Sequence, residues 1–171
     1  MSNFLDVSKA LRYPGQEYPV SEDIAIEDME FAGDPIAFTG VKLEGVLVGA
    51  GEEVSVQGTV TAQLHSRCVR CLEEVTMDVS TRVEAVFARK PDPDDPDLYC
   101  FEASTIELTD AARDALIMEI PMTILCSEDC RGLCPVCGVN RNKESCTCQE
   151  GGEVTNPFAA LKAIVLNDEE V

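Results

Sequence analysis

Two long segments of the chain alternate between apolar and polar residues with a period of two. This period places every second side chain on the same side of a β-strand, so each segment can pack one apolar face against a core. The apolar positions of residues 54–66 and 73–88 are Val54, Val56, Val60, Ala62, Leu64, Val75, Met77, Val79, Val83, Ala85 and Phe87. The two segments are joined by the short stretch "RCVRCLE". This pattern predicts an antiparallel hairpin with Cys68 and Cys71 at its tip.

Two further segments are predicted to be strands. Residues 36–48 carry β-branched residues in a looser alternation, and residues 98–103 are long enough for a short strand. The stretch "KPDPDDPD" at residues 90–97 combines prolines with aspartates and predicts a solvated loop. Together with the hairpin, these segments predict an antiparallel sheet from about residue 36 to residue 103.

Two segments have the spacing of helices. Thr109 is predicted to be the N-cap of a helix that runs to about Ile120, where Pro121 ends it. One stripe of this helix is apolar except at Glu119, and it consists of Ala112, Ala115, Leu116, Glu119 and Ile120. A C-terminal helix is predicted near residues 157–166, with Asn156 as its cap and Pro157 as its first residue.

These elements predict an α+β fold, in which an antiparallel β-sheet, open or barrel-like, packs with a few helices. Residues 1–125 are expected to form a β-rich core, and residues 126–150 a cysteine-rich tongue that packs on this core. Residues 151–171 carry the C-terminal helix. A length of 171 residues suits a single domain overall.

The charge of the chain narrows the choice of partners. The formal net charge is −19, and such a field repels phosphate backbones and membranes while it attracts basic proteins. Proteins with a broad nucleic-acid footprint need a basic face, which this composition does not supply. The first residues, "MSNFLDVSKALRYPG", do not resemble a signal peptide, and no stretch approaches the roughly 18 apolar residues of a membrane span. We therefore expect a cytoplasmic protein that does not bind membranes.

The cysteines are the strongest chemical signal in the sequence. In a reducing compartment, clustered cysteines are more often metal ligands or redox thiols than structural disulfides. Once Cys100 is set aside, eight of the nine cysteines form close pairs. The pairs are Cys68 with Cys71, Cys126 with Cys130, Cys134 with Cys137, and Cys146 with Cys148. Eight thiolates suffice for two tetrahedral zinc sites of four cysteines each.

The spacing assigns the pairs to two sites. "CPVCG" at residues 134–138 is typical of a zinc knuckle, because the glycine after the second cysteine permits a left-handed turn. Its expected partners are Cys146 and Cys148, a short loop away. The hairpin knuckle, with Cys68 and Cys71, would then take Cys126 and Cys130 and tie the tongue to the sheet. Both Zn²⁺ ions are expected to be structural.

Other uses of these residues are less favoured. A redox dithiol usually lies in a βαβ unit, and the sequence pattern predicts no such unit around these cysteines. The spacing of Cys130, Cys134 and Cys137 matches that of radical-SAM iron–sulfur enzymes, but only 34 residues follow Cys137, too few for their barrel. Cys100 is expected to be a small buried hydrophobe. His65, the single histidine, is expected on the polar face of a strand, and no catalytic constellation can be assembled around it.

Four stretches of the chain resemble the YceD family. "RCVRCLEEV", "IMEIPM", "LCSEDCRGLCPVCGVNRNKESCTC" and "NPFAALKAIV" occur in the order typical of that family, and "LDVSKALRYPG" is similar to its N-terminus. Its members are described as large ribosomal RNA subunit accumulation proteins. The resemblance implies a role in accumulation of the large ribosomal RNA, with a precursor of the large subunit as partner. It implies no catalytic residues. The region from Cys134 to Cys148 is typical of a cysteine-rich branch of the family.

Basic residues gather around the cysteines. Arg131, Arg141 and Lys143 lie in the tongue, and Arg67 and Arg70 flank the hairpin knuckle. They can offset the negative charge of zinc held by four thiolates, or contact phosphate groups of rRNA.

Three functions remain open. The first is a non-enzymatic assembly factor for the large ribosomal subunit, with a basic ribosomal protein as main contact and rRNA as secondary contact. The second is an acidic binding module or holdase for a basic ribosomal protein. The third is an rRNA-processing enzyme, which two closed four-thiolate sites do not favour because no coordination position stays open. We expect neither catalytic activity nor a small-molecule substrate.

Overall fold

The computed structural model describes residues 3–31, 33–90 and 97–148. The chain divides into two compact units, Met1–Cys130 and Arg131–Val171. The predicted boundaries at residues 125 and 150, and the packing of the tongue on the core, stay predictions. The predicted C-terminal helix at residues 157–166 lies outside the described residues.

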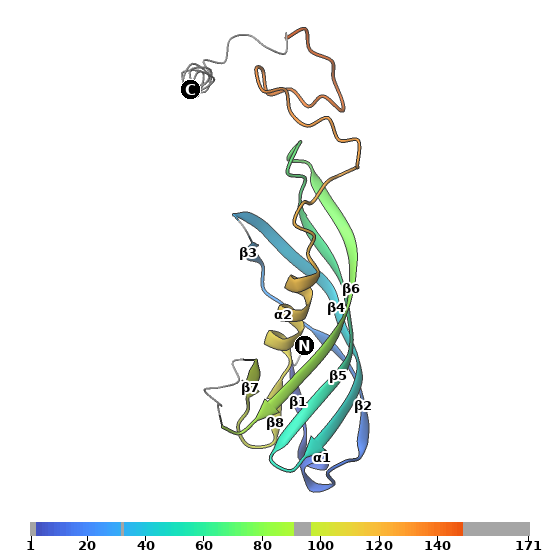
Figure 1. The fold of residues 1–171 in the computed structure, drawn as a ribbon, viewed down its shortest axis with the longest axis vertical. Coiled ribbons are helices and arrows are strands. Elements are labelled where there is room, and N and C mark those ends of the chain that lie inside the picture. The colour runs from blue at the N-terminus through green and yellow to red at the C-terminus, as the bar shows by residue number, and fades with distance from the viewer. Residues whose placement is uncertain (1–2, 32, 91–96, 149–171) are drawn as a thin grey trace, which may run out of the picture. The chain divides into compact units, whose positions relative to one another are not determined.

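The first unit is built on a long, mainly antiparallel sheet (Figure 1). Its strands are, in spatial order, β2 (Glu17–Ile24), β4 (Asp34–Ala50), β5 (Glu53–Arg67), β6 (Glu74–Ala88) and β7 (Leu98–Cys100). A short strand, β3 (Met29–Phe31), pairs with the start of β4. A second, two-stranded sheet consists of β1 (Phe4–Asp6) and β8 (Thr105–Glu107). The helices are α1 (Ser8–Arg12) and α2 (Thr109–Glu119).

The predicted α+β class is confirmed, with two differences in the sheet. Strand β2 precedes the predicted sheet in the sequence, and all of its residues pair with β4. Strand β7 pairs with β6 in parallel rather than antiparallel orientation. In the described part of the chain, β2 and β7 are the two edges of an open sheet, so these strands do not close into a barrel.

The hairpin of β5 and β6 is the frame that carries the first cysteine pair. Its register runs from Val54 opposite Phe87 to Arg67 opposite Glu74 without a shift. The predicted alternation of the two strands is confirmed, because their apolar positions face the core and the intervening positions are mostly exposed. The uninterrupted pairing places the turn that contains Cys68 and Cys71 at the end of the hairpin.

Two glycines let β4 and β5 approach closely on the core side. Gly45 and Gly58 lie directly opposite each other in the ladder. A Cβ on Gly45 would overlap the carbonyl oxygen of Gln57, and one on Gly58 would overlap that of Glu44. Replacement of either residue by alanine would therefore push the two strands apart.

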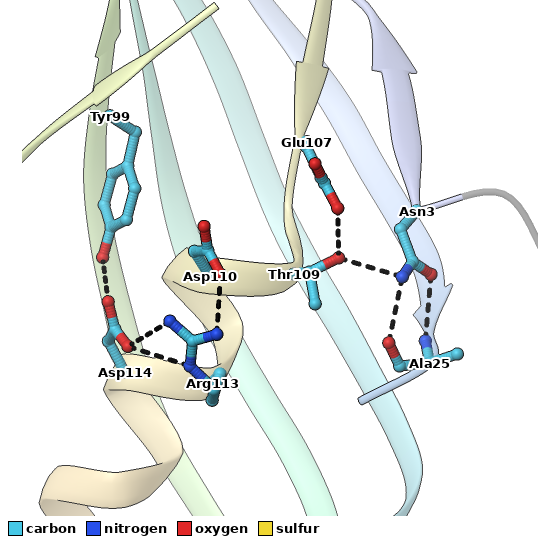
Figure 2. Close-up of polar contacts among 8 residues, drawn as sticks. All are labelled: Asn3, Ala25, Tyr99, Glu107, Thr109, Asp110, Arg113 and Asp114. Atoms are coloured by element: carbon cyan, nitrogen blue, oxygen red, sulfur yellow. Dashed lines mark hydrogen bonds and ion pairs between the residues drawn. The ribbon is translucent and has the colours of Figure 1, made fainter. Parts of the chain in front are cut away.

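Helix α2 packs on the face of the sheet formed by β5 and β6 (Figure 1). Ala111, Ala112 and Leu116 are its buried side chains, whereas Glu119 is exposed. The prediction that Thr109 is the N-cap was wrong, because Leu108 holds that position and Thr109 begins the helix. The Thr109 hydroxyl instead accepts a hydrogen bond from the Asn3 side chain and donates one to Glu107 (Figure 2).

No helix among the described residues is long and apolar enough to cross a membrane. In the second unit, residues 131–148 contain turns and one isolated bridge, between Leu133 and Asn140.

Candidate metal centres

Four cysteine sulfurs meet at the tip of the β5–β6 hairpin. This hairpin cluster consists of Cys68, Cys71, Cys126 and Cys130, whose Sγ atoms all lie within 4.8 Å of one another. The Sγ atoms of Cys68 and Cys130 are 3.7 Å apart, and those of Cys71 and Cys126 are 3.6 Å apart. A tetrahedral zinc site with Zn–S bonds of about 2.3 Å has S···S edges of about 3.8 Å. The donor set and its spacing therefore fit Zn²⁺.

A second group of four sulfurs lies in the second unit. This tongue cluster consists of Cys134, Cys137, Cys146 and Cys148, again with all Sγ atoms within 4.8 Å of one another. The structure thus brings together the eight predicted cysteines in the two predicted groups. All nine cysteines of the chain are thiols rather than disulfides. That the clusters bind metal stays a prediction.

The two knuckles have the same backbone hydrogen bonds. In the hairpin knuckle, the N–H of Leu72 donates to the carbonyl of Cys68, and the N–H of Cys68 donates to the carbonyl of Glu73, both at 2.8 Å. In the tongue knuckle, Gly138 and Cys134 make the equivalent bonds at 2.8 Å, with Val139 as the second acceptor. Both turns thus close around a cysteine in the geometry that exposes N–H groups to its sulfur.

The residue after the second cysteine differs between the knuckles. Gly138 has φ +73°, and the equivalent Leu72 has φ +61°. Left-handed backbone costs about 1–2 kcal/mol for a residue with a Cβ, and glycine escapes this cost. The hairpin knuckle therefore holds a strained leucine where the tongue knuckle has an unstrained glycine.

Arg70 contacts the chain segment that carries Cys126 and Cys130. Its Nη1 donates to the carbonyl oxygen of Cys130 at 3.0 Å and lies 3.4 Å from that of Glu128. The backbone N–H of Val69 also donates to the carbonyl of Ile124 at 3.0 Å. These contacts hold the segment with Cys126 and Cys130 against the knuckle. Arg70 thus has an internal role through Nη1, and the prediction that it also contacts rRNA stays a prediction.

Backbone N–H groups lower the pKa of one cysteine in each cluster. Burial alone would raise the pKa of the Cys68 thiol, but N–H groups of Cys126, Cys71 and Arg70 lower it to about 6. N–H groups of Cys137 and Val136 likewise lower the pKa of Cys134 to about 6, against a smaller effect of burial. The N–H groups therefore favour the thiolate form of both sulfurs.

The neighbouring thiols keep their protons. Burial and hydrogen bonds with the other sulfurs of the hairpin cluster outweigh the N–H of Glu73 and raise the pKa of Cys71 to about 12. The hydrogen bond with Cys137, followed by burial, raises the pKa of Cys148 to about 12. The pKa values of Cys126 and Cys146 are raised as well, mainly by the hydrogen bonds with Cys130 and Cys134. Crowded sulfurs thus share protons that a divalent cation would replace.

The two residues that we predicted to stand apart from the clusters have different outcomes. His65 lies on β5 with its ring nitrogens 2.8 Å from Oγ1 of Thr39 and 3.1 Å from Oγ1 of Thr76, which confirms its place among polar neighbours. Cys100 is exposed, so the prediction that it is buried was wrong. On the edge strand β7, Tyr99 packs against Phe87, and the period of two turns Cys100 to the other side.

The open sheet, the four-cysteine cluster at the hairpin tip and the second four-cysteine cluster define a small α+β protein with two cysteine knuckles. The chain belongs to the YceD family, described as "Large ribosomal RNA subunit accumulation protein YceD", whose model matches residues 56–165. The matched region includes all eight clustered cysteines.

Curated relatives occur in bacteria and plants. The chain is 26% identical over 161 residues to protein YlbN of Bacillus subtilis, which covers 92% of this chain and 93% of that protein. It is 33% identical over 105 residues to an uncharacterized protein of Mycobacterium leprae, a match that covers 58% of this chain and 48% of the relative. The chain thus spans about half the length of this mycobacterial relative.

A plant relative has a descriptive name. The chain is 38% identical over 47 residues to "Large ribosomal RNA subunit accumulation protein YCED homolog 1, chloroplastic" of Arabidopsis thaliana, which covers 28% of this chain and 15% of that protein. No solved structure matches the chain.

Proposed function

We propose that this protein is a non-enzymatic factor that promotes accumulation of the large-subunit rRNA by binding precursors of the large ribosomal subunit. Its two cysteine clusters hold structural Zn²⁺. Membership of the YceD family supports the ribosomal role. The observation that carries the structural role of the metal is the hairpin cluster, in which sulfurs 55 and 62 residues apart along the chain approach to 3.6 and 3.7 Å.

The donor sets favour structural over catalytic metal. Four sulfurs complete the coordination of Zn²⁺, whereas a catalytic zinc keeps one position for water or substrate. Both nitrogens of His65, the single histidine of the chain, already lie within hydrogen-bond distance of threonine hydroxyls. A general base for RNA chemistry needs a ring nitrogen that is free to take a proton, and both nitrogens of this imidazole already have hydroxyl partners. These features support a binding protein rather than an rRNA-processing enzyme.

Charge supports a basic ribosomal protein as the main contact. The chain has 32 acidic and 13 basic residues, so its field attracts lysine- and arginine-rich proteins and repels phosphate over most of its surface. Contacts with rRNA are secondary and involve Arg67, Arg70, Arg131, Arg141 and Lys143. The same charge favours a second candidate, a holdase that binds a basic ribosomal protein before it meets rRNA. Both functions imply a location where ribosomal subunits assemble, which in a bacterium is the cytoplasm.

Deletion and complementation test the proposal. Cells that lack the protein are expected to have a lower ratio of large-subunit to small-subunit rRNA, which wild-type protein restores and Cys68→Ser restores only in part. Tagged wild-type protein is expected to co-sediment with large-subunit precursors. Recovery with a free ribosomal protein but no rRNA would favour the holdase. Absence from both fractions, with a normal rRNA ratio in the deletion strain, would contradict both candidates.

A further inference from the structure

Exposed methionines mark the outward side of α2. Met118 is 86% exposed, and Met122, just beyond the helix, is fully exposed. Asp110, Asp114 and Met118 follow one another at intervals of four residues, so they form one line along the helix surface, opposite the buried side that includes Ala112. Large apolar side chains of this exposure gain free energy when a partner covers them. We call the surface formed by Asp110, Arg113, Asp114, Ile117 and Met118, together with Met122 just beyond the helix, the α2 ridge.

Open grooves flank this ridge on both sides. One groove has a volume of about 600 Å³ and the other of about 610 Å³, and Ile117 lines both of them. Met29 contributes apolar surface to the first groove, and Met118 contributes it to the second. Unbranched methionine side chains adapt to partners of varied shape, which suits a surface that receives an extended or helical segment. The ridge and its grooves therefore offer apolar anchor points on either side of one helix.

Carboxylates surround these anchor points. Those that line the two grooves are Glu27, Asp28, Glu84, Asp97, Glu107 and Asp114. Among the cations, Arg113 lies 2.8 Å from Asp110 and 3.2 Å from Asp114, so its charge is offset within the ridge (Figure 2). Arg82 is the further cation that lines the second groove. The surface around the methionines is therefore negative.

Tyr99 lies next to the carboxylates of the ridge. Its hydroxyl donates to Oδ2 of Asp114 at 3.0 Å (Figure 2). Burial, followed by this hydrogen bond and then by the charges of Asp114, Asp110 and Asp97, raises the pKa of Tyr99 to about 12. The charges of these aspartates disfavour the phosphates of RNA at this site and favour ammonium and guanidinium groups.

We propose that the α2 ridge and its two grooves dock a lysine- or arginine-rich polypeptide segment that also carries apolar side chains. The methionines and Ile117 take the apolar side chains, and the flanking carboxylates take the cations. This inference rests on the proposed function, because it names the surface that receives the basic ribosomal protein. This surface combines apolar anchors with charge that is complementary to such a segment.

Binding of two probe peptides to the full zinc-loaded chain tests the surface directly. One probe is a synthetic amphipathic peptide of lysine and leucine, and the other has glutamate in place of lysine. Calorimetry is expected to show binding of the lysine peptide alone. The double variant Met118→Ser/Met122→Ser removes both anchors at exposed positions, and we expect a roughly tenfold loss of affinity. Glu27→Lys, at an exposed carboxylate that lines the first groove, is expected to weaken binding severalfold and to reduce its salt dependence.

Matched controls lie on other exposed parts of the sheet. Glu17→Lys makes the same charge change on β2, and Val86→Thr removes an exposed apolar group from β6. Neither control is expected to change the affinity for the lysine peptide. Equal affinity of the ridge variants and wild type would overturn the proposal, as would an equal loss in the controls. Concentration-dependent dimers that the ridge variants abolish would identify a second copy as the occupant and would also overturn it.

Photo-crosslinking separates this inference from the proposed function. A photoreactive residue replaces Met122 in one variant and Thr59, on the outward face of β5, in the control. In cells, the Met122 probe is expected to crosslink to a basic ribosomal protein and the Thr59 probe is not. If the protein co-sediments with subunit precursors but the Met122 probe crosslinks to rRNA or to nothing, the ridge proposal fails alone. If the lysine peptide binds the ridge but no subunit precursor binds the protein, the proposed function fails alone.

Discussion

The hairpin cluster and the tongue cluster have the same ligands and the same knuckle, yet they are held together differently. The hairpin cluster joins the end of a long β-hairpin to a segment more than 50 residues away, and three of its cysteines are at most 4% exposed. The tongue cluster draws its ligands from residues 134–148, and three of them are exposed or half-buried. With the proposed Zn²⁺ bound, the first cluster would be a tertiary crosslink of the first unit, whereas the second would stabilise a local loop.

Loss of one ligand should have the largest effect, and a different effect in each cluster. Structural zinc contributes roughly 10–16 kcal/mol of apparent free energy in small zinc-finger peptides. Cys68→Ser should reduce the metal content from two ions to one and release residues 124–130 from the hairpin tip. Cys134→Ser should also leave one ion, but the first unit should keep its stability. Native mass spectrometry counts the ions, and hydrogen exchange measures protection in β5 and β6.

The two serine variants can contradict the proposed difference between the clusters. Equal loss of protection in β5 and β6 in both variants would show that the tongue cluster also stabilises the sheet. No loss in either would show that the hairpin cluster is not a tertiary crosslink.

Removal of Arg70 should affect the hairpin cluster alone. Partners that orient metal ligands typically contribute 10–100-fold to metal affinity, so Arg70→Ala should weaken zinc binding there by at least about tenfold. Arg67→Ala, which changes an exposed arginine three residues away, is the control and should leave both affinities unchanged. Competition with a chromophoric chelator measures the two affinities. An unchanged hairpin affinity in Arg70→Ala would show that its bonds to Glu128 and Cys130 are dispensable.

An exchange of the residues after the knuckles should have a smaller effect. Gly138→Leu places a Cβ at φ +73° and should cost about 1–2 kcal/mol, or about a tenfold loss of zinc affinity in the tongue cluster. Leu72→Gly relieves strain in the native hairpin knuckle, but glycine also gains entropy in the unfolded chain, so its net effect should lie within about 1 kcal/mol of zero. The same chelator competition measures both variants. A large loss in Leu72→Gly would show that the leucine packs in the cluster.

The pH dependence of zinc affinity should differ least between the two clusters. Cys68 and Cys134 have pKa values of about 6, below the ordinary thiol value of 9.0, so the stability that their thiolates contribute is present above pH 9 and lost as pH falls through about 6. Binding of zinc must also displace protons from Cys71 and Cys126, and from Cys146 and Cys148, whose pKa values are raised. At least two protons per cluster are therefore released, so the zinc affinity should rise by at least about 100-fold per pH unit above pH 6. Calorimetry in buffers of different ionisation enthalpy counts these protons, and fewer than two in either cluster would contradict the assignment.

Local patterns made the hairpin and the cysteine groups predictable. The period of two in residues 54–66 and 73–88 requires one buried face, and this fixes the register that places Cys68 and Cys71 in the turn. The close spacing of the other cysteines leaves few ways to form sets of four. Once the tongue knuckle takes its near neighbours, Cys126 and Cys130 are the ligands that remain for the hairpin.

Features that depend on tertiary contacts could not be predicted from local sequence patterns. Arg70 is an ordinary surface cation until residues 126–130 bring carbonyl oxygens to its guanidinium. Cys100 has aromatic neighbours that suggest burial, but an edge strand exposes one of its sides. Thr109 has the composition of a cap, yet the Asn3 side chain, 106 residues away, engages its hydroxyl at the start of the helix.

Zinc K-edge X-ray absorption spectroscopy of protein purified without added metal tests the central claim most directly. Two closed four-thiolate centres predict a single shell of four sulfurs at about 2.3 Å, with no nitrogen or oxygen ligand. Because the signal averages both clusters, an open position in either one would add a light-atom contribution. A mixed sulfur and oxygen or nitrogen shell, or a protein that contains iron or no metal instead of zinc, would contradict the account.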